Sequence, residues 1–313
     1  MQSDYQAMAI HAFGEPGVLK PISLPMLQPQ KDEMLIKVRS TAINPIDVKT
    51  RAGIGFAAEQ NKGNLPLVLG YDLFGEVEQC GSDVTGFKQG DFVIGMIGFA
   101  TQPGTYAQYA KARSNELIKV DNTNIEPQLS GLCLAGLTAF QAISSLDCPK
   151  NQPLYVNGAN GTVGSLAIQI AANMGYQVIA VTRSELPAGL AGKFVQMDYD
   201  EFVSNPSKRY LIDVVGLEVG MRCLQGLSVQ SSIVTIPTLS QAQIIAAAKL
   251  QGVNGKGVLV VKNKAQLQRI YSWYQQGKLV LAHKTMPLSA AGFAHQQIEQ
   301  NNSKEKVILL PWS

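Results

Sequence analysis

The chain has 313 residues, 46% of them hydrophobic, and a formal net charge of only +3. A chain of this length can bury a large core and is expected to form two domains. The charges are spread along the chain, which excludes the basic stripe of a nucleic-acid-binding or membrane-surface protein, and no stretch approaches the roughly 20 apolar residues that span a bilayer. The first residues are polar, without an apolar run of signal-peptide length, so a cytoplasmic protein is expected.

The cysteines and histidines give no sign of a metal site. The four cysteines are far apart and form no C-x-x-C pair, which excludes a zinc ribbon. The three histidines are equally scattered, and each is expected to be structural or solvated rather than a ligand. These residues are Cys80, Cys133, Cys148, Cys223, His11, His283 and His295. Chemistry without a metal is therefore expected.

From residue 8 to about residue 120 the sequence is rich in short alternating strands separated by glycines. This pattern predicts a barrel-like domain without long helices. A helical linker is predicted over 127–146, and alternating strands and helices begin at Leu154. Later predicted elements are strands at 210–215, 232–236 and 257–261, a helix over 265–276, and a last strand at 306–310 that returns to the first domain.

These elements predict an α/β protein built from a β-rich barrel domain and a doubly wound parallel-sheet (Rossmann) domain. The expected division is a β-rich substrate domain over 1–122, a dinucleotide-binding domain over 123–264, and a return segment over 265–313 that completes the substrate domain.

The most informative segment runs from Leu154 to Arg183 and has the pattern strand, turn, helix, strand. Its glycines permit positive φ, bring the backbone close to a pyrophosphate and let the helix pack on the strand, while the helix N-terminus offers free N–H groups to the anion. A helix over 165–174 that stops at Gly175, and a strand over 177–182, place the turn where a dinucleotide needs it. A tight turn in another kind of α/β protein is the alternative. The turn consists of Gly158, Ala159, Asn160, Gly161, Thr162, Val163 and Gly164.

The choice of cofactor depends on Arg183. It stands about nineteen residues after Gly164, where a carboxylate would bind the ribose 2′-hydroxyl of NAD. A cation at this position suits a 2′-phosphate, so we favour NADP (NADPH) over NAD. The alternative is that Arg183 is a solvated residue at the end of a strand.

The order of these domains resembles the medium-chain dehydrogenase/reductase superfamily, and in particular its zinc-independent quinone oxidoreductase branch. Similar blocks extend over nearly the whole chain: 42–53 resembles the substrate-loop signature, 69–77 and 81–93 the next block, and Leu137-Thr138 and the Gly158–Gly164 turn follow in the expected order. The resemblance implies a GroES-like first domain and oxidoreductase activity.

Both zinc-ligand motifs of the metal-dependent relatives are replaced. Gly70-Tyr71-Asp72 stands where those relatives have Gly-His-Glu, and Asn44 stands where they have a cysteine. The resemblance therefore implies hydride transfer from NADPH to a quinone, or to the β-carbon of an α,β-unsaturated carbonyl, without a metal. A positioned donor or water would then protonate the enolate.

The segment Asn44-Pro-Ile-Asp47-Val-Lys49 is similar to the alkenal and enone reductases of the family. This similarity implies that Lys49 is the acid or oxyanion partner and that Asn44 faces nicotinamide and substrate. A solvated loop cation is the alternative for Lys49, and Asp47 and Arg51 are expected to make structural hydrogen bonds or an ion pair. No tyrosine occupies Val48 to Arg51, where many quinone reductases of this branch have one.

Further cofactor contacts are implied with the same resemblance. Thr138 matches the helix that approaches nicotinamide, and Tyr199 matches an aromatic residue that supports the adenosine phosphate. Strand ends at Val215-Gly216 and Ile236-Pro237 lie at the carboxyl edge of the predicted sheet, where ligands bind in open α/β folds. Between Arg183 and Ile212 the chain is about ten residues shorter than the family pattern, and prolines and glycines there weaken any helix. An open adenosine side is expected.

Three functions stay open at this point. The first is an NADPH-dependent reductase of quinones or enones, which are small electrophilic substrates. The second is a cofactor-binding protein with a structural or regulatory role and little turnover. The third is an enoyl-thioester reductase. The resemblance also implies a homodimer, in which the predicted apolar strand 257–261 lies at a sheet edge and pairs with a second copy.

Overall fold

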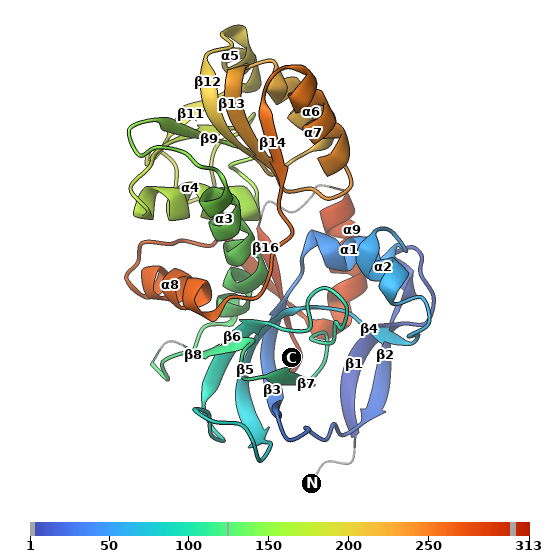
Figure 1. The fold of residues 1–313 in the computed structure, drawn as a ribbon. Helices are drawn as coiled ribbons and strands as arrows, with labels where there is room; N and C mark the ends of the chain where they lie inside the picture. Colours follow the sequence, from blue (N-terminus) through green and yellow to red (C-terminus); the bar gives the residue numbers. More distant parts are fainter. Residues whose placement is uncertain (1–3, 124, 301–304) are drawn as a thin grey trace. The chain divides into compact units, whose positions relative to one another are not determined.

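The computed structural model describes residues 4–123, 125–300 and 305–313 and divides them into two compact units (Figure 1). Unit 1 contains the described residues of 1–134, 261–268 and 283–313, and unit 2 contains 135–260 and 269–282. The predicted return of the last strand to the first domain is confirmed, because residues 306–310 pair with a strand of unit 1.

In the described part of unit 1 the strands form two sheets, and antiparallel pairs predominate. The smaller sheet has the order β2-β1-β4, and the larger has the order β15-β16-β3-β5-β6-β8, with β7 paired to β3. The bounds are β1 (Asp4–Ile10), β2 (Leu19–Pro25), β3 (Glu33–Ala42), β4 (Leu67–Val68), β5 (Asp72–Cys80), β6 (Phe92–Met96), β7 (Tyr109–Arg113), β8 (Leu117–Lys119), β15 (His283–Pro287) and β16 (Lys306–Leu310).

Strand β3 lies within the larger sheet of unit 1 and is buried on both faces. Its side chains alternate between two apolar clusters: Met34, Ile36 and Val38 pack on one side and Leu35 on the other. A strand that is buried on both faces must be covered by chain on both sides. The two apolar clusters cover the faces of β3, and its edges pair with β5, β7 and β16.

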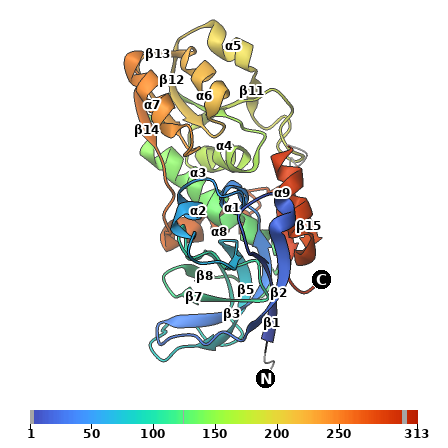
Figure 2. The ribbon, with the colours of Figure 1, turned by 90° about the vertical axis from the view of Figure 1, so that its right-hand side faces the viewer.

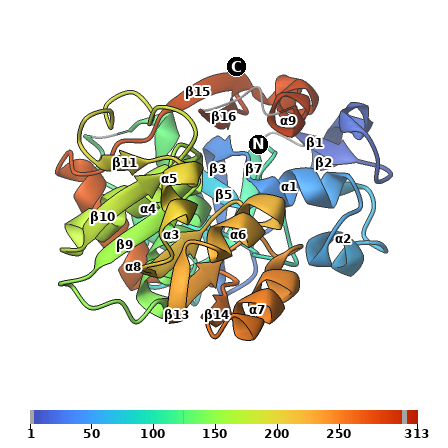
Figure 3. The same cartoon turned by 90° about the horizontal axis from the view of Figure 1, so that it is seen from above.

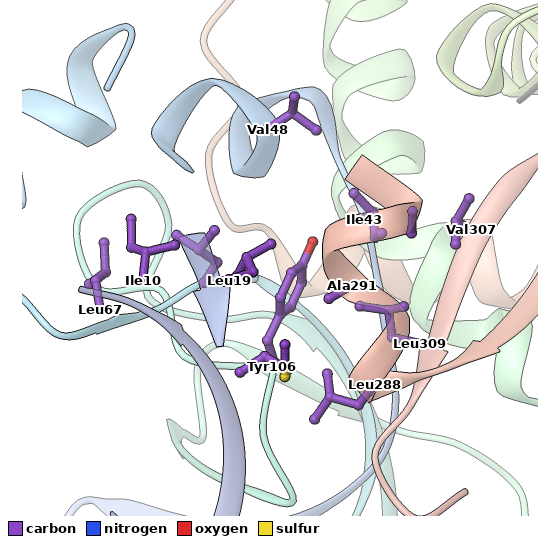
Figure 4. Packing of buried hydrophobic residues seen from close by; sticks show 13 residues of the cluster. Ile10, Leu19, Ile43, Val48, Leu67, Tyr106, Leu288, Ala291, Val307 and Leu309 are labelled. Carbon is purple, nitrogen blue, oxygen red and sulfur yellow. The ribbon is translucent and has the colours of Figure 1, made fainter. Parts of the chain in front are cut away.

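The helices of unit 1 are short, as the β-rich pattern predicts. Figure 3 shows α1 and α2 side by side, and Figure 2 shows α9 beside β15, in agreement with their contacts. An apolar cluster that includes Ile10, Val48 and Leu309 holds α1, β1 and β16 together (Figure 4). The bounds are η1 (Pro16–Val18), α1 (Pro45–Arg51), α2 (Phe56–Gln60), η2 (Pro127–Leu132), η3 (Leu288–Ala290) and α9 (Ala291–Glu299).

Unit 2 is a parallel sheet with the order β11-β10-β9-β12-β13-β14. Numbered within the unit, this is the 3-2-1-4-5-6 order of the Rossmann fold, which reverses between β9 and β12. Helix α4 packs on β9 and β10, whereas α5, α6 and α7 pack together and their apolar side chains share one cluster with β12 and β13. The bounds are β9 (Pro153–Asn157), α4 (Thr162–Asn173), β10 (Gln177–Val181), β11 (Val195–Met197), α5 (Tyr199–Ser204), β12 (Lys208–Asp213), α6 (Leu217–Leu224), β13 (Leu227–Thr235), α7 (Gln241–Leu250) and β14 (Asn254–Gly257).

The observed unit boundaries differ from the predicted domain boundaries at 122/123 and 264/265. Unit 1 extends to residue 134 because the Asp72 carboxylate accepts a hydrogen bond from the Leu134 backbone N–H, at the start of α3 (Cys133–Ser145). Residues 269–282 belong to unit 2, although α8 (Lys264–Gln275) begins in unit 1. Trp273 stacks on Phe140, and Gln169 makes two hydrogen bonds to the backbone of Val280.

The predicted strand at 257–261 is wrong. The strand is β14, which pairs with β13 only as far as Gly257 opposite Thr235. The next residues of that neighbouring chain are Ile236, whose N–H donates to Asp213 O, and Pro237, which has no N–H. The ladder between β13 and β14 therefore ends at Gly257. None of the helices in the described ranges is long and apolar enough to cross a membrane.

Candidate functional site

The glycine turn of unit 2 joins β9 to α4, and of its three glycines only Gly158 has the positive φ that the sequence predicts. Gly158 has a φ of +76°, and a Cβ there would lie 2.6 Å from Val215. A Cβ on Gly164 would lie 2.1 Å from the Gly158 carbonyl oxygen, so the helix can approach the strand only with glycine there. At Gly161, by contrast, the nearest atom to a Cβ is the Gly158 oxygen at 3.6 Å. Gly161 leaves a space over the first turn of α4, where N–H groups are free to meet an anion.

The other predicted cofactor residues of unit 2 lie at the same carboxyl edge. Val215 and Gly216 follow β12, and Ile236 and Pro237 follow β13. A Cβ on Gly216, whose φ is +71°, would come within 2.9 Å of Pro237, so these two loops touch. Val215 is 38% exposed, whereas Thr138 on α3 is buried. The structure thus gathers Gly158, Val215, Gly216 and Pro237 at one place.

A buried polar network, which the sequence did not reveal, supports this edge. The Asp213 carboxylate ends β12 and is fully buried. Its Oδ1 accepts hydrogen bonds from the backbone N–H groups of Val215 and Gly216, at 3.1 and 2.9 Å, and from Asn157 Nδ2 at 2.7 Å. Its Oδ2 accepts one from the Thr235 hydroxyl at 2.8 Å. Asp213 therefore fixes the loop that follows its own strand.

Tyr199 belongs to this network. It is the first residue of α5, only 7% exposed, and its hydroxyl donates to Asn157 Oδ1 at 2.6 Å. The pKa of the Tyr199 phenol is raised to about 12, mainly by burial. The nearby Arg183 guanidinium opposes this shift. The hydroxyl proton is thus engaged in a hydrogen bond to another residue of the protein. The predicted contact of Tyr199 with an adenosine phosphate stays a prediction.

Arg183 is exposed immediately after β10, and the short segment that follows it has no helix. Residues 188–193 form turns instead, with positive φ at Gly189 and Gly192. Leu186 and Leu190 are nevertheless buried. The expected weakening of a helix is therefore seen, although two apolar side chains of the segment are buried.

In unit 1 the predicted catalytic loop forms the start of α1. Asn44 is the N-cap of this helix, and its backbone N–H donates to Asp47 Oδ2 at 2.8 Å. Its side chain is only 1% exposed: Nδ2 donates to Ala42 O at 3.2 Å and to Asp72 Oδ2 at 2.8 Å, and Oδ1 accepts from Lys306 Nζ at 2.6 Å. The amide of Asn44 has no proton left to give a ligand. Its predicted contact with nicotinamide and substrate remains a prediction.

Lys49 lies on the same helix and is partly buried. Burial lowers the pKa of its ammonium, and no charged neighbour contributes to that shift. Among the described residues, no carboxylate pairs with Lys49. An ammonium with a lowered pKa and no partner is a suitable proton donor.

The buried charges around α1 make a second network. Arg51 pairs with Glu299 of α9, as the expectation of a structural ion pair requires, while Asp47 Oδ1 and Arg51 Nε and Nη1 have no hydrogen-bond partner. The Tyr106 hydroxyl lies 3.0 Å from His295 Nε2, and Figure 4 shows it pointing toward α1 and α9. Burial is the main cause that raises the pKa of Asp47 to about 7 and lowers the pKa of His295 to about 3.

Sequence reasoning missed the buried polar roles of Asp213 and Asn157 in unit 2 and of Lys306 and His295 in unit 1. Asp213 carried a usable signal, because it lies near the end of a predicted strand at the carboxyl edge of the sheet. Lys306 carried none. A lysine at the first position of a short apolar strand is expected to be solvated, and only the fold shows that it is 4% exposed.

Comparison with known proteins places these features in a family. Residues 30–122 match the alcohol dehydrogenase GroES-like domain, and residues 195–309 match the family described as zinc-binding dehydrogenase. The NADPH-dependent alkenal/one oxidoreductase of Arabidopsis thaliana chloroplasts is 30% identical over 90% of this chain and 73% of its own length. The quinone oxidoreductase structure from Coxiella burnetii is 33% identical with a TM-score of 0.89, over 98% of this chain and 99% of that one.

The chain belongs to the medium-chain dehydrogenase/reductase superfamily. The GroES-like and Rossmann-like parts predicted from the sequence are those of this superfamily. The quinone oxidoreductases of Lama guanicoe and Homo sapiens are each 31% identical over 184 residues. The chain spans 53% of the length of each of these two superfamily members.

Zinc does not fit the residues of this superfamily member. At the positions where the sequence comparison expects ligands stand Asn44, Tyr71 and Asp72, and the Lys306 ammonium is hydrogen-bonded to the first of them. The Tyr71 hydroxyl donates to Ala100 O at 3.1 Å. Within 4–123, 125–300 and 305–313, no group of three or more His, Cys, Asp or Glu side chains could hold a metal ion. No step of the reaction is therefore assigned to zinc.

Proposed function

We propose that this protein is an NADPH-dependent reductase that transfers a hydride to a quinone or to an α,β-unsaturated carbonyl without a metal. The observation that carries the proposal is the glycine turn, whose open position at Gly161 faces the free N–H groups of α4. The names of two relatives, a quinone oxidoreductase and an NADPH-dependent alkenal/one oxidoreductase, support the choice of acceptor.

The cofactor would be held by residues of unit 2. The backbone of Gly161, Thr162, Val163 and Gly164 suits the pyrophosphate, and Arg183 suits the 2′-phosphate of NADPH. Thr138 and the loops 215–216 and 236–237 would contact the nicotinamide end. When bound, NADPH supplies the hydride, so the protein has to bind, orient and exclude water.

Lys49 would supply the proton or stabilise the developing negative charge on an enone oxygen. Its ammonium is partly buried and has no carboxylate partner in the described part of the chain, which favours this role over that of a solvated cation. A quinone can take its proton from water and needs Lys49 less.

The decisive experiment measures NADPH oxidation with a panel of quinones, 2-alkenals and enoyl thioesters, before and after chelator dialysis. We expect turnover of at least one of the first two classes, unchanged by the chelator. Turnover of enoyl thioesters alone would favour that reductase class, and no turnover at all would favour a cofactor-binding protein. If the chelator abolished activity and removed one metal ion per chain, the proposal of a metal-free reaction would be contradicted.

Lys49→Met tests the proton donor in the same assay. We expect kcat for an enone to fall by roughly 10² to 10³, the scale of losing one preorganised donor, while turnover of a quinone falls much less. Affinity for NADPH should stay within about twofold. Unchanged enone turnover would reject the role of Lys49.

The assembly is proposed to be a homodimer. β14 is the edge strand of the unit 2 sheet, and Leu259 and Val261, just beyond it, are each 60% exposed. An exposed apolar segment next to a sheet edge is a hazard for aggregation, and contact with a second copy would cover it. The cytoplasmic location expected from the sequence stays a prediction.

A further inference from the structure

The buried lysine of β16 is the feature of unit 1 that the proposed reaction does not yet use. Lys306 is 4% exposed, and its Nζ donates to Asn44 Oδ1 at 2.6 Å and lies 3.7 Å from Asp72 Oδ2. A buried ammonium is costly unless it is paired and hydrogen-bonded. Here its neighbours are the residue predicted to act in the site and a fully buried carboxylate.

The chemistry of these partners determines how the Asn44 amide must be turned. An ammonium has three N–H donors and no acceptor, so only the amide oxygen can face Lys306. The Asp72 carboxylate accepts the amide N–H₂ from the other side at 2.8 Å. Ala42 O accepts from the same nitrogen at 3.2 Å. Both protons of the amide are therefore used, and the side chain can meet a further hydrogen-bonding group only through its oxygen, as an acceptor.

The same group of residues holds two helix starts. Asn44 is the N-cap of α1, whose Asp47 accepts the Asn44 backbone N–H at 2.8 Å. The second oxygen of Asp72 accepts the backbone N–H of Leu134, at the start of α3, at 2.7 Å. Lys306 is thus the cation that balances the carboxylate and orients the amide at the beginning of the helix that presents Lys49.

We propose that Lys306 is a positioning residue that fixes Asn44 as a hydrogen-bond acceptor, so that a ligand group in contact with Asn44 must be an N–H or O–H donor. This inference rests on the proposed reductase function only for its effect on turnover. It also implies that a residue other than Asn44 stabilises the oxyanion, because an amide without a free N–H cannot donate a hydrogen bond to a negative oxygen.

Lys306→Met tests the proposal with a side chain of similar length that carries no charge. Without the ammonium the side-chain amide of Asn44 is free to rotate and exchange its oxygen and nitrogen, and the Asp72 carboxylate loses its neighbouring cation. We expect kcat with an enone to fall about 10²-fold, the effect of a small misplacement in a site, while Lys306→Arg retains more activity than Lys306→Met. A fall in melting temperature with kcat and the NADPH KM both within twofold of wild type would overturn the proposal.

A matched control separates positioning from general loss of a buried lysine. Lys208, on β12 of unit 2, is 7% exposed, and its Nζ donates to the backbone oxygen of Asn205. Lys208→Met is expected to lower the melting temperature and leave kcat within twofold. An equal fall of kcat in Lys208→Met and Lys306→Met would overturn the positioning role.

Chemical rescue gives a readout that does not depend on turnover. In Lys306→Ala, methylammonium or ethylammonium can occupy the space of the missing ammonium. We expect these ions, compared with sodium at the same ionic strength, to raise the melting temperature of Lys306→Ala but not that of wild type. They should also restore enone turnover in a saturable way.

If alkylammonium gives no stabilisation beyond that of sodium, the buried cation role is wrong. If wild type oxidises no NADPH with any acceptor while rescue of the melting temperature still occurs, the proposed function fails and the role of Lys306 in the network stands. The two failures are therefore distinguishable.

Discussion

At the scale of a single residue, Arg183 is the residue that we propose selects the cofactor. It is exposed after β10, where a carboxylate would select NAD, and a guanidinium can bind a 2′-phosphate through charge-assisted hydrogen bonds. We expect Arg183→Ala to weaken NADPH binding by about 10- to 100-fold and to leave NADH binding nearly unchanged. Titration of cofactor fluorescence measures both. Arg209→Ala, an exposed arginine on β12, is the control, and equal losses for the two cofactors would show that Arg183 is structural.

Asp47 makes stability depend on pH. Burial raises the pKa of its carboxyl from 3.8 to about 7, so between these values the folded state holds a proton that the unfolded state has lost. Asp47 therefore destabilises the fold as the pH rises from about 4 to 7, by on the order of 1 kcal/mol per pH unit. The nearby Asp72 carboxylate raises this pKa further, whereas Lys306 and Tyr106 lower it. We expect Asp47→Asn to gain stability relative to wild type as the pH rises through this range, as measured by melting temperature.

His295 acts in the opposite direction and serves as the comparison. Its pKa falls from 6.5 to about 3 on burial, so the unfolded state binds the additional proton between these values and stability rises with pH. The Asp47→Asn protein should therefore show a steeper rise of melting temperature between pH 4 and about 6.5 than wild type. Parallel curves for the two proteins would show that the Asp47 carboxyl titrates in the folded state as it does in the unfolded chain.

The first turn of α4 can be tested as an element with two glycine variants. A Cβ on Gly164 would lie 2.1 Å from the Gly158 oxygen, so Gly164→Ala should lower the melting temperature and cofactor affinity together. A Cβ on Gly161 would meet only one atom, at 3.6 Å, and its φ of −84° suits alanine. Gly161→Ala should keep the melting temperature within a few degrees and still weaken cofactor binding, because the methyl group fills the space above the free N–H groups.

Calorimetry and cofactor titration of the two glycine variants separate these effects. Gly175→Ala provides a third comparison, because Gly175 has a φ of +86° and no neighbouring atom within 4 Å, so it tests backbone strain alone. Full cofactor affinity in Gly161→Ala would reject the turn as the pyrophosphate site.

At this scale the sequence was informative where local pattern determines structure. The helix stopped by Gly175, the strand after it and the last strand all form within a few residues of their predicted bounds, because periodicity and punctuation are local signals. The strand at 257–261 did not form, because pairing depends on where its neighbour ends. Lys306 acquires its role only from contacts between distant segments, because it is separated from Asn44 by 262 positions in the sequence. Such contacts leave no pattern in a single sequence.

At the scale of the whole molecule, the apolar residues beyond β14 predict association. Leu259 and Val261 are each 60% exposed and follow an edge strand that has free backbone groups on one side. We expect light scattering at micromolar concentration to give twice the chain mass of 33.7 kDa. The pairing of two identical edges across a two-fold axis closes the assembly at two copies.

The Leu259→Glu and Val261→Glu double variant should shift this mass toward the monomer, because two carboxylates cannot be buried without partners at an interface. Leu250→Glu is the matched control: Leu250 is 90% exposed at the end of α7, and the substitution should leave the mass unchanged. A monomer mass for the unmodified chain would contradict the dimer. A dimer that the double variant does not weaken would instead place the interface on another surface, since burying both glutamates at the proposed edge costs more than a standard interface can offset.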